Sequence, residues 1–248
     1  MNNMGAVIRL EKDENIALIT LNRPEKLNAF SVEMRNQLYD MVLAIRDDPT
    51  VDAVVLCGEG RGFCAGADLT EFGTDPPVLQ KRRIRLQMDL WEEIRRMSKP
   101  IAVALHGFAI GSGLEMAMLC DFRFAAPGTK LALPEPTLGM IPAAGGTQSL
   151  PRLVYQGLAL DFALGGQQIT AEEAVKLRLI SDVFPAEKLV ESTVDYMKKL
   201  VAPCPRAAKS IKSLVAHGMD MSLSQGLARE RAVALRSWLN WREMDDPD

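Results

Sequence analysis

Apolar and polar residues recur along this chain with periods that change from strand-like to helix-like. Residues 6–10 and 15–21 are short apolar-rich runs typical of β-strands, and the polar linker Glu11–Asn15 predicts a hairpin between them. Over residues 32–46 the apolar side chains recur at three- and four-residue intervals, which predicts a helix with one buried face. Ser31 precedes this stretch and predicts its N-cap, because its hydroxyl can accept a bond from a free backbone N–H.

Two further runs, Val51–Cys57 and Ile101–Leu105, are almost entirely apolar. Such runs favour strands that are buried on both faces. Residues 78–97 lie between them and carry an amphipathic pattern that predicts a long helix. Strands and helices therefore alternate, and this order predicts an α/β fold with a parallel sheet and crossover helices.

The pattern changes after about Asp182, where no strand separates three helical stretches at residues 187–201, 205–216 and 222–241. These stretches carry more apolar surface than solvated helices would show, and we expect part of them to pack on the main domain or on another subunit. The apolar residues in question are Met219, Met221, Leu223, Leu227, Leu235, Trp238 and Trp241.

Composition narrows the class of protein. The 248 residues include 29 basic and 32 acidic side chains, for a net charge of −3, which gives no electrostatic reason to expect nucleic acid as a partner. The four cysteines are scattered and predict reduced thiols. The first residues show no signal or transit segment, and the apolar run 101–119 is interrupted by His106, glycines and Glu115, so we expect no membrane span and a cytoplasmic protein.

Two carboxylates, Glu115 and Glu135, stand out between Gly107 and Gly146, because both lie among apolar, glycine and proline residues. An enzyme that adds or removes water across a polarised double bond needs two such groups. One handles the water and the other a carbon-bound proton, and the two must differ in protonation.

Each glutamate also has a purely structural interpretation. The segment Ser112-Gly-Leu-Glu115 has the spacing of a capping box, with Ser112 as the N-cap and Glu115 reaching back to it. Glu135 stands between Pro134 and Pro136, and Pro136 disfavours a helical conformation for the residue before it. Glu135 is therefore either an ordinary turn residue or a positioned acid/base.

The turn Gly60–Leu69 offers backbone N–H groups, which an oxyanion needs. The glycines at 58, 60 and 62 do not have the spacing of a dinucleotide-binding loop. His106 and His217 are too few and too far apart for a metal site, so we expect none.

Together these segments give the chain its resemblance to the crotonase (enoyl-CoA hydratase/isomerase) superfamily. The matching segments are Ile16–Ala29 with Asn22-Arg23-Pro24, Phe63–Leu69, Cys120-Asp121, Gly139–Thr147 and Ile180–Val183, and the likeness continues less distinctly into the tail. The resemblance implies the crotonase (ClpP-like) fold of repeated β-β-α units. Residues 1–185 would form the core for acyl-CoA binding and catalysis. Residues 186–248 would form a helical trimerisation module, in a homotrimer or homohexamer.

The resemblance also implies roles for individual residues. The backbone N–H groups of Ala67 and Ser112 would form an oxyanion hole for the thioester, and Glu115 and Glu135 would be the catalytic pair. The substrate-binding or CoA-binding positions would be Lys26, Leu27, Ala29, Ala65, Asp68 and Leu69. No metal or redox cofactor is implied, since CoA arrives as part of the substrate.

The expected reaction is that of an enoyl-CoA hydratase, which adds water across the 2,3 double bond to give a 3-hydroxyacyl-CoA. Related enzymes often lack one or both glutamates, and both are present here. An enoyl-CoA isomerase or acyl-CoA hydrolase is the first alternative. The second is a non-catalytic or RNA-binding homologue, suggested by basic residues at 81–85 and at Lys198, Lys199, Arg206, Lys209 and Lys212. The net charge of −3 favours the other explanation of these residues, as solvated faces and contacts to CoA phosphates.

One departure from the family concerns Ser112, where a typical hydratase carries glycine. A backbone N–H is still supplied by serine, while the added hydroxyl changes the pocket. Residues Thr70–Trp91 are expected to form one wall of the acyl pocket, and their sequence does not identify the acyl group.

Overall fold

The computed structural model describes residues 6–71 and 88–244. Its centre is a six-stranded sheet in the order β1-β2-β3-β4-β6-β9, in which β1 is antiparallel to β2 and the remaining pairs are parallel. The strands are β1 (Ile8–Asp13), β2 (Ile16–Leu21), β3 (Ala53–Gly58), β4 (Ile101–Leu105), β6 (Phe122–Ala125) and β9 (Asp182–Val183). The predicted parallel sheet is confirmed.

The hairpin is tighter than the sequence suggested. Strand β1 continues to Asp13 and leaves only Glu14 and Asn15 as the connection, with Glu14 at a φ of 55°. Charged residues extend this strand because it lies at the edge of the sheet, where one side of each residue faces solvent.

A second, three-stranded sheet was not predicted from the periodicity. It consists of β5 (Phe108–Ile110), β7 (Lys130–Ala132) and β8 (Gln168–Thr170). Strands β4 and β5 precede α4 (Ser112–Leu119), and β6 and β7 precede η3 (Glu135–Leu138) and α5 (Gly146–Leu153). The chain therefore repeats a unit of one strand in each sheet followed by a helix, which confirms the crotonase fold expected from the resemblance.

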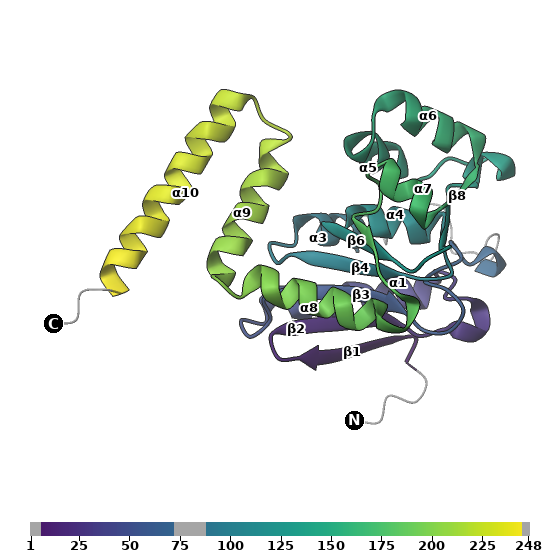
Figure 1. The fold of residues 1–248 in the computed structure, drawn as a ribbon, viewed down its shortest axis with the longest axis horizontal. Coiled ribbons are helices and arrows are strands. Elements are labelled where there is room, and N and C mark those ends of the chain that lie inside the picture. The colour runs from purple at the N-terminus through teal and green to yellow at the C-terminus, as the bar shows by residue number, and fades with distance from the viewer. Residues whose placement is uncertain (1–5, 72–87, 245–248) are drawn as a thin grey trace.

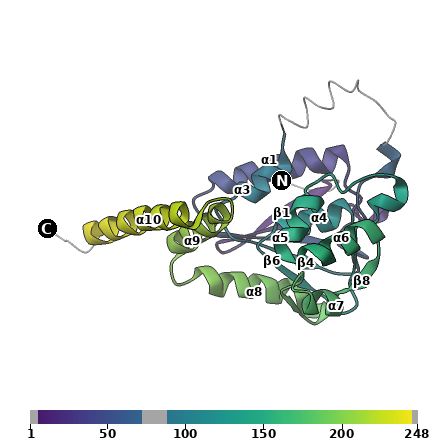
Figure 2. The same ribbon diagram turned by 90° about the horizontal axis from the view of Figure 1, so that it is seen from above.

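The six-stranded sheet is covered on both faces because its central strands are apolar at every position. Val54 and Leu56 of β3 face the large core with α1 (Val32–Asp47) and α3 (Leu90–Arg96), while Ala53 and Val55 face α8 (Leu189–Val201). Figure 2 shows α1 and α3 on one side of the sheet and α8 on the other. The remaining helices of the core are α6 (Gln156–Gly165), α7 (Ala171–Lys176), η1 (Pro24–Lys26), η2 (Leu69–Glu71) and η4 (Ala186–Lys188).

Helix α1 forms as predicted, with the Ser31 hydroxyl accepting a bond from Met34 N at 3.2 Å. The long helix predicted over residues 78–97 is present at its C-terminal end as α3, and residues 78–87 lie outside the described residues. Met34, Leu38, Val42 and Ile45 of α1 are all buried, which is the apolar face that the pattern indicated.

The predicted C-terminal module has two unlike parts. Helix α8 packs into the core beneath the sheet through an apolar face that includes Met197 and Val201. Helices α9 (Pro205–Gly218) and α10 (Leu223–Met244) form an antiparallel pair that projects away from the sheet (Figures 1 and 2). The boundary expected between a core of residues 1–185 and a C-terminal module of residues 186–248 stays a prediction.

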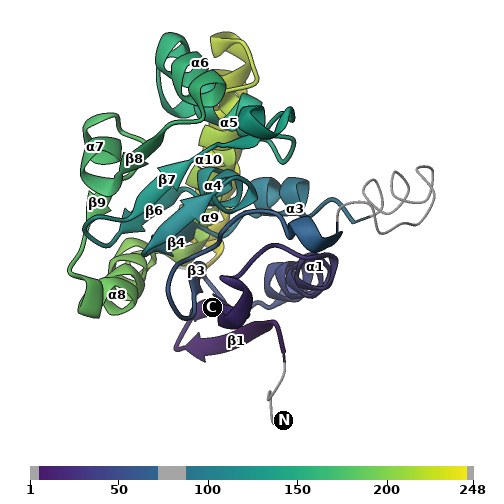
Figure 3. The same ribbon diagram turned by 90° about the vertical axis from the view of Figure 1, so that its right-hand side faces the viewer.

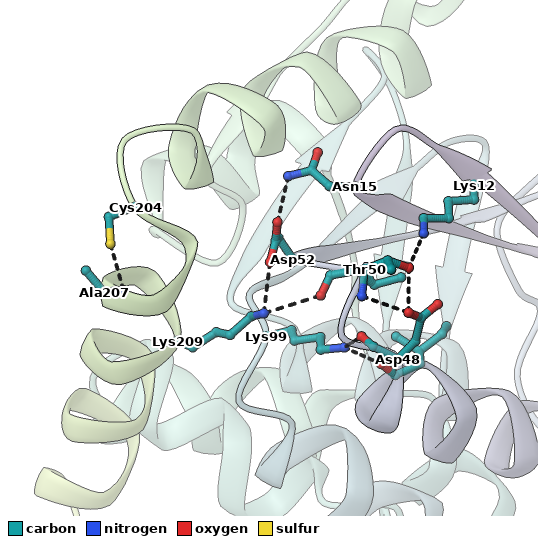
Figure 4. A network of polar contacts seen from close by, with 11 residues as sticks. Lys12, Asn15, Asp48, Thr50, Asp52, Lys99, Cys204, Ala207 and Lys209 are labelled. Carbon is teal, nitrogen blue, oxygen red and sulfur yellow. Dashed lines mark hydrogen bonds and ion pairs between the residues drawn. The ribbon is translucent and has the colours of Figure 1, made fainter. Parts of the chain in front are cut away.

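Helix α9 is attached to the core by charged contacts, and it buries none of its own residues. Lys209 pairs with Asp52 at 2.8 Å, and Lys212 pairs with Asp121 at 2.8 Å and donates to Lys99 O at 2.9 Å. Figure 4 shows this region, in which the buried Lys99 ammonium donates to the carbonyls of Ile45 and Asp48 near the end of α1. Asp52, Lys99 and Asp121 lie one or two residues before the strands β3, β4 and β6, so α9 sits at the N-terminal edge of the parallel sheet.

Candidate active site

The turn after β3 presents the backbone of Ala67 to the opposite, C-terminal edge of the sheet. Phe30 forms a parallel bridge with Ala67, in which Phe30 N donates to Gly66 O at 2.7 Å and Asp68 N donates to Phe30 O at 3.1 Å. In a parallel bridge of this kind, the residues on either side of Ala67 make the hydrogen bonds to Phe30. The N–H of Ala67 itself points away from Phe30. The N–H of Ala67 has no acceptor among the described residues.

Helix α4 begins beside this turn, and its N-cap is Gly111 at a φ of 51°, with no side-chain cap bond. The predicted capping box is therefore wrong: Ser112 is the first helical residue, and the carboxylate of Glu115 bonds elsewhere. The N–H of Ser112 lies in the first turn, where no helical acceptor exists, and it finds none elsewhere in the described chain. Gly111 takes the cap position because its backbone angle suits glycine better than serine.

Glycines allow the two segments to approach closely. A β-carbon on Gly66 would lie 3.1 Å from Ile110 O, and one on Gly111 would lie 3.8 Å from Gly66 Cα. The unused N–H groups of Ala67 and Ser112 are thus carried by neighbouring backbone segments. Such a pair of donors can hold developing negative charge on one oxygen.

Glu115 is buried, with 1% of its surface exposed, and its carboxylate is held by the backbone of a distant loop. Its Oε1 accepts from Ala144 N and from Gly146 N, both at 2.8 Å. A β-carbon on residue 146 would lie 2.8 Å from that same oxygen, so only glycine leaves room for it. Two N–H donors favour the ionised form, because a carboxylate can only accept.

Glu135 differs from Glu115 in its hydrogen bonds. It begins the short helix η3, and Pro136 fits within the first turn, so the expectation that Pro136 would exclude Glu135 from a helical turn is wrong. Burial raises the pKa of Glu135, and its Oε2 is buried without a hydrogen-bond partner among the described residues. Its Oε1 lies 2.6 Å from where a β-carbon of residue 111 would stand. The neutral acid is favoured here by desolvation.

Both glutamates line one cavity of about 1070 Å³, together with Ala67 and Ser112. Of the six positions expected to bind CoA, Ala65 and Leu69 also line the cavity, but Lys26, Leu27, Ala29 and Asp68 do not. Phe30, which precedes α1, and Trp91 of α3 line it as well. The remaining lining residues are Ser31, Val32, Arg35, Gly66, Glu71, Met88, Asp89, Ile110, Gly111, Pro134, Leu138, Met140, Ile141, Ala143, Ala144 and Gly145. Of the expected acyl-pocket wall Thr70–Trp91, the residues Glu71, Met88, Asp89 and Trp91 line the cavity, and residues 72–87 lie outside the described residues.

The six positions expected to bind CoA come together in space, since residues 26–29 and 65–69 adjoin. Ala65 N donates to Leu27 O at 3.1 Å, and Leu27 has a left-handed φ of 54°. The carboxylate of Asp68 accepts from the Thr70 hydroxyl and pairs with Arg23, both at 2.6 Å, and these contacts lower its pKa to about 2. Asp68 therefore fixes the loop that carries Ala67, while CoA contact by these six residues stays a prediction.

Sequence reasoning missed two sets of positioning groups. Asn28 is fully buried and joins three segments, accepting from Arg23 N and donating to the carbonyls of Glu59 and Gly62. The backbone donors of Ala144 and Gly146 were missed because a main-chain N–H has no sequence signature. The paired glycines 145 and 146 were the available signal for a close approach.

The described residues contain no cluster of three or more potential metal ligands. In the same part of the chain, no helix combines the length and the apolar character needed to cross a membrane. Burial raises the pKa of both Cys64 and Cys120 to about 12, as expected for inert thiols.

Residues 11–237 match the family model described as enoyl-CoA hydratase/isomerase, and the chain belongs to this family. It is 36% identical over 224 residues to 2,3-dehydroadipyl-CoA hydratase of Escherichia coli (strain K12), covering 90% of this chain and 87% of the relative. It is 34% identical over 225 residues to crotonyl-CoA hydratase of Syntrophomonas wolfei, covering 90% and 86%.

Solved structures agree with this assignment. The fold is similar to that of enoyl-CoA hydratase subunit I from Geobacillus kaustophilus HTA426, with a TM-score of 0.88, 32% identity and coverage of 94% and 90% of the two chains. It is also similar to a Thermobifida fusca YX protein crystallised in complex with CoA, with a TM-score of 0.90, 28% identity and coverage of 96% and 95%.

Proposed function

We propose that the protein is an enoyl-CoA hydratase that adds water across the 2,3 double bond of an enoyl-CoA thioester to give a 3-hydroxyacyl-CoA. The observation that carries this proposal is the pair of glutamates with different hydrogen bonds in one cavity. Glu115 accepts from two backbone N–H groups, and Glu135 has a buried oxygen without a partner among the described residues. Water addition needs such a base and such an acid at the same time.

The mechanism follows from these placements. The thioester oxygen accepts from the N–H groups of Ala67 and Ser112, which stabilise the enolate that forms when water attacks. The ionised Glu115 binds the water and takes its proton as oxygen attacks the β-carbon. The protonated Glu135 delivers its proton to the α-carbon. After the addition Glu115 carries the proton taken from water and Glu135 is ionised, so passage of this proton from Glu115 to Glu135 returns both carboxyl groups to their starting states.

No change of oxidation state accompanies this addition, so the proposal invokes no redox cofactor, and CoA enters as part of the substrate. Hydratases among the relatives and the CoA complex of a structural neighbour support the substrate class.

We also propose the trimeric or hexameric assembly and the cytoplasmic location expected from the sequence. Exposed apolar residues on the projecting helices support the assembly, among them Ile211, Val215, Met219, Leu223 and Leu235.

The RNA-binding alternative is less well supported by the described basic residues. Lys198 pairs with Asp13 and Glu14, while Lys209 and Lys212 pair with carboxylates of the core. These ammonium groups are engaged in ion pairs within the chain. The residues 81–85 of the other basic cluster lie outside the described residues.

The reaction can be tested with crotonyl-CoA in isotopically labelled water. The expected product keeps its CoA thioester, gains the mass of one labelled water molecule and carries the label on the third carbon. An isomerase would leave the mass unchanged, and a hydrolase would release free CoA. Either outcome would contradict the proposal, and a panel of linear, branched and aromatic enoyl-CoA substrates would then define the acyl group.

A further inference from the structure

The hydroxyl of Ser112 is a polar group of the cavity that the mechanism above does not use. Ser112 lines the cavity as the first residue of α4 and is only partly buried. Its hydroxyl makes no hydrogen bond with any described residue, and it does not cap the helix, because Glu115 N donates to Gly111 O at 2.9 Å. This hydroxyl is therefore available to a ligand.

The position of this hydroxyl restricts what it can contact. The N–H and the hydroxyl of Ser112 belong to one residue that lines the cavity, so a single ligand oxygen can accept hydrogen bonds from both. Ser112 and Glu115 are separated by three positions in α4, which places them one helical turn apart on the same face. The hydroxyl and the carboxylate proposed to hold water therefore lie on the same face of α4, and both residues line the cavity.

We propose that the hydroxyl of Ser112 is a third donor to the thioester oxygen and a catalytic group for enolate formation. This inference rests on the proposed function. A hydroxyl donates more strongly to an oxygen that carries negative charge than to a neutral carbonyl. The bond therefore strengthens as the enolate forms, and it lowers the barrier more than it tightens substrate binding.

Removing only the hydroxyl tests this role. In Ser112→Ala the backbone N–H remains. We expect kcat for crotonyl-CoA to fall roughly 10- to 100-fold, which does not exceed the usual loss of rate when one oxyanion-hole donor is removed. KM should change little. Ser112→Thr keeps a hydroxyl on the same carbon and should recover most of the lost rate. Circular dichroism and sedimentation of each variant establish that fold and assembly match the wild type.

A direct readout of the oxyanion site is the ultraviolet absorbance of bound acetoacetyl-CoA, which ionises to an enolate without any water addition. We expect the enolate band of the complex to appear at higher pH in Ser112→Ala than in wild type, and at near wild-type pH in Ser112→Thr. If the alanine variant forms the enolate at the wild-type pH, the hydroxyl does not contact the thioester oxygen and the inference is wrong.

The two experiments separate this inference from the proposed function. A wild-type protein that binds acetoacetyl-CoA as the enolate but does not hydrate crotonyl-CoA would overturn the proposed function, while the Ser112 comparison would still be decided by the enolate band. A wild-type protein that hydrates crotonyl-CoA, with an unchanged enolate band in Ser112→Ala, would overturn only the role of Ser112. Failure of the wild type in both assays would overturn both.

Discussion

Glu115 and Gly146 are 31 positions apart in the chain and are in direct contact, with Glu115 Oε1 2.8 Å from Gly146 N. The glycine contributes twice to this contact. Its N–H donates to the carboxylate, and its missing side chain leaves space that a β-carbon would fill, at 2.8 Å from the same oxygen and 2.7 Å from Pro142 Cβ. The orientation of the proposed base is therefore set by the backbone of another segment.

Gly146→Ala should lower kcat for enoyl-CoA hydration by about 10-fold or more, because small displacements of a positioned catalytic group are costly. The added methyl must displace Glu115 Oε1 or the loop. Gly218→Ala is a matched control, since a β-carbon on that helical glycine has no neighbour within 4 Å. Steady-state kinetics of the two variants make the comparison, and a Gly146→Ala enzyme as fast as the control would show that this contact does not position the base.

Glu135→Gln should retain its fold and thioester binding and lose about 10²- to 10⁴-fold in kcat, the usual contribution of a positioned acid or base. In the wild type, hydration should slow as pH rises through the raised pKa of Glu135, because the acid form is then lost. Kinetics over a pH series measure both effects. Retention of near wild-type kcat by the glutamine variant would exclude Glu135 as the proton donor.

The same substitution should change stability with a defined sign. A carboxyl whose pKa is raised by burial binds its proton more tightly in the folded than in the unfolded chain. The free energy of unfolding therefore decreases as pH rises from the ordinary value of 4.5 to the raised one. At pH values above the raised pKa, Glu135→Gln should melt at a higher temperature than wild type, and an equal or lower Tm there would argue that Glu135 is not desolvated.

The periodic parts of the fold could be predicted from the sequence because burial produces a regular pattern. Met34, Leu38, Val42 and Ile45 identified α1, and continuous apolar runs identified β3 and β4. The second sheet escaped this reasoning, since three-residue strands such as β5 and β7 are too short to show a period. The β-β-α repeat was therefore expected only from the resemblance.

The candidate site, like the fold, could be predicted only in part from the sequence. Glu115 and Glu135 could be selected from their apolar surroundings, but their protonation depends on contacts that the sequence does not display. Ser112 and Glu115 have the spacing of a capping box, and yet Gly111 takes the cap and Glu115 binds Gly146 instead. Long-range backbone donors decide this outcome, and one-dimensional spacing rules do not include them.

The oxyanion hole can be tested at Ala67, whose contribution is its N–H. Ala67→Pro removes that donor and should lower the rate by about 10²- to 10³-fold, while Ala67→Ser keeps the N–H and should cost far less. Circular dichroism and sedimentation check that the turn and the assembly survive. A folded proline variant with near wild-type turnover would mean that Ala67 is not the donor.

The projecting pair α9 and α10 should be covered in a larger assembly. Val215 is 63% exposed, Met219 71% and Leu223 79%, which is unfavourable for helices in water. Sedimentation should give the mass of a trimer or hexamer, and deletion of residues 218–248 should cause aggregation. A monodisperse species at 27.3 kDa, the mass of one chain, would contradict this expectation.

The central claim is that Glu115 and Glu135 act together on one substrate in a single addition of water, and the rate of the double variant tests it most directly. Crotonyl-CoA hydration should be measured for Glu115→Gln, Glu135→Gln and the combination, with fold and assembly matched to wild type. Groups that serve the same step are strongly non-additive, so the double variant should be little slower than the slower single variant. Losses that multiply in the double variant would show that the two glutamates act independently and would contradict the account.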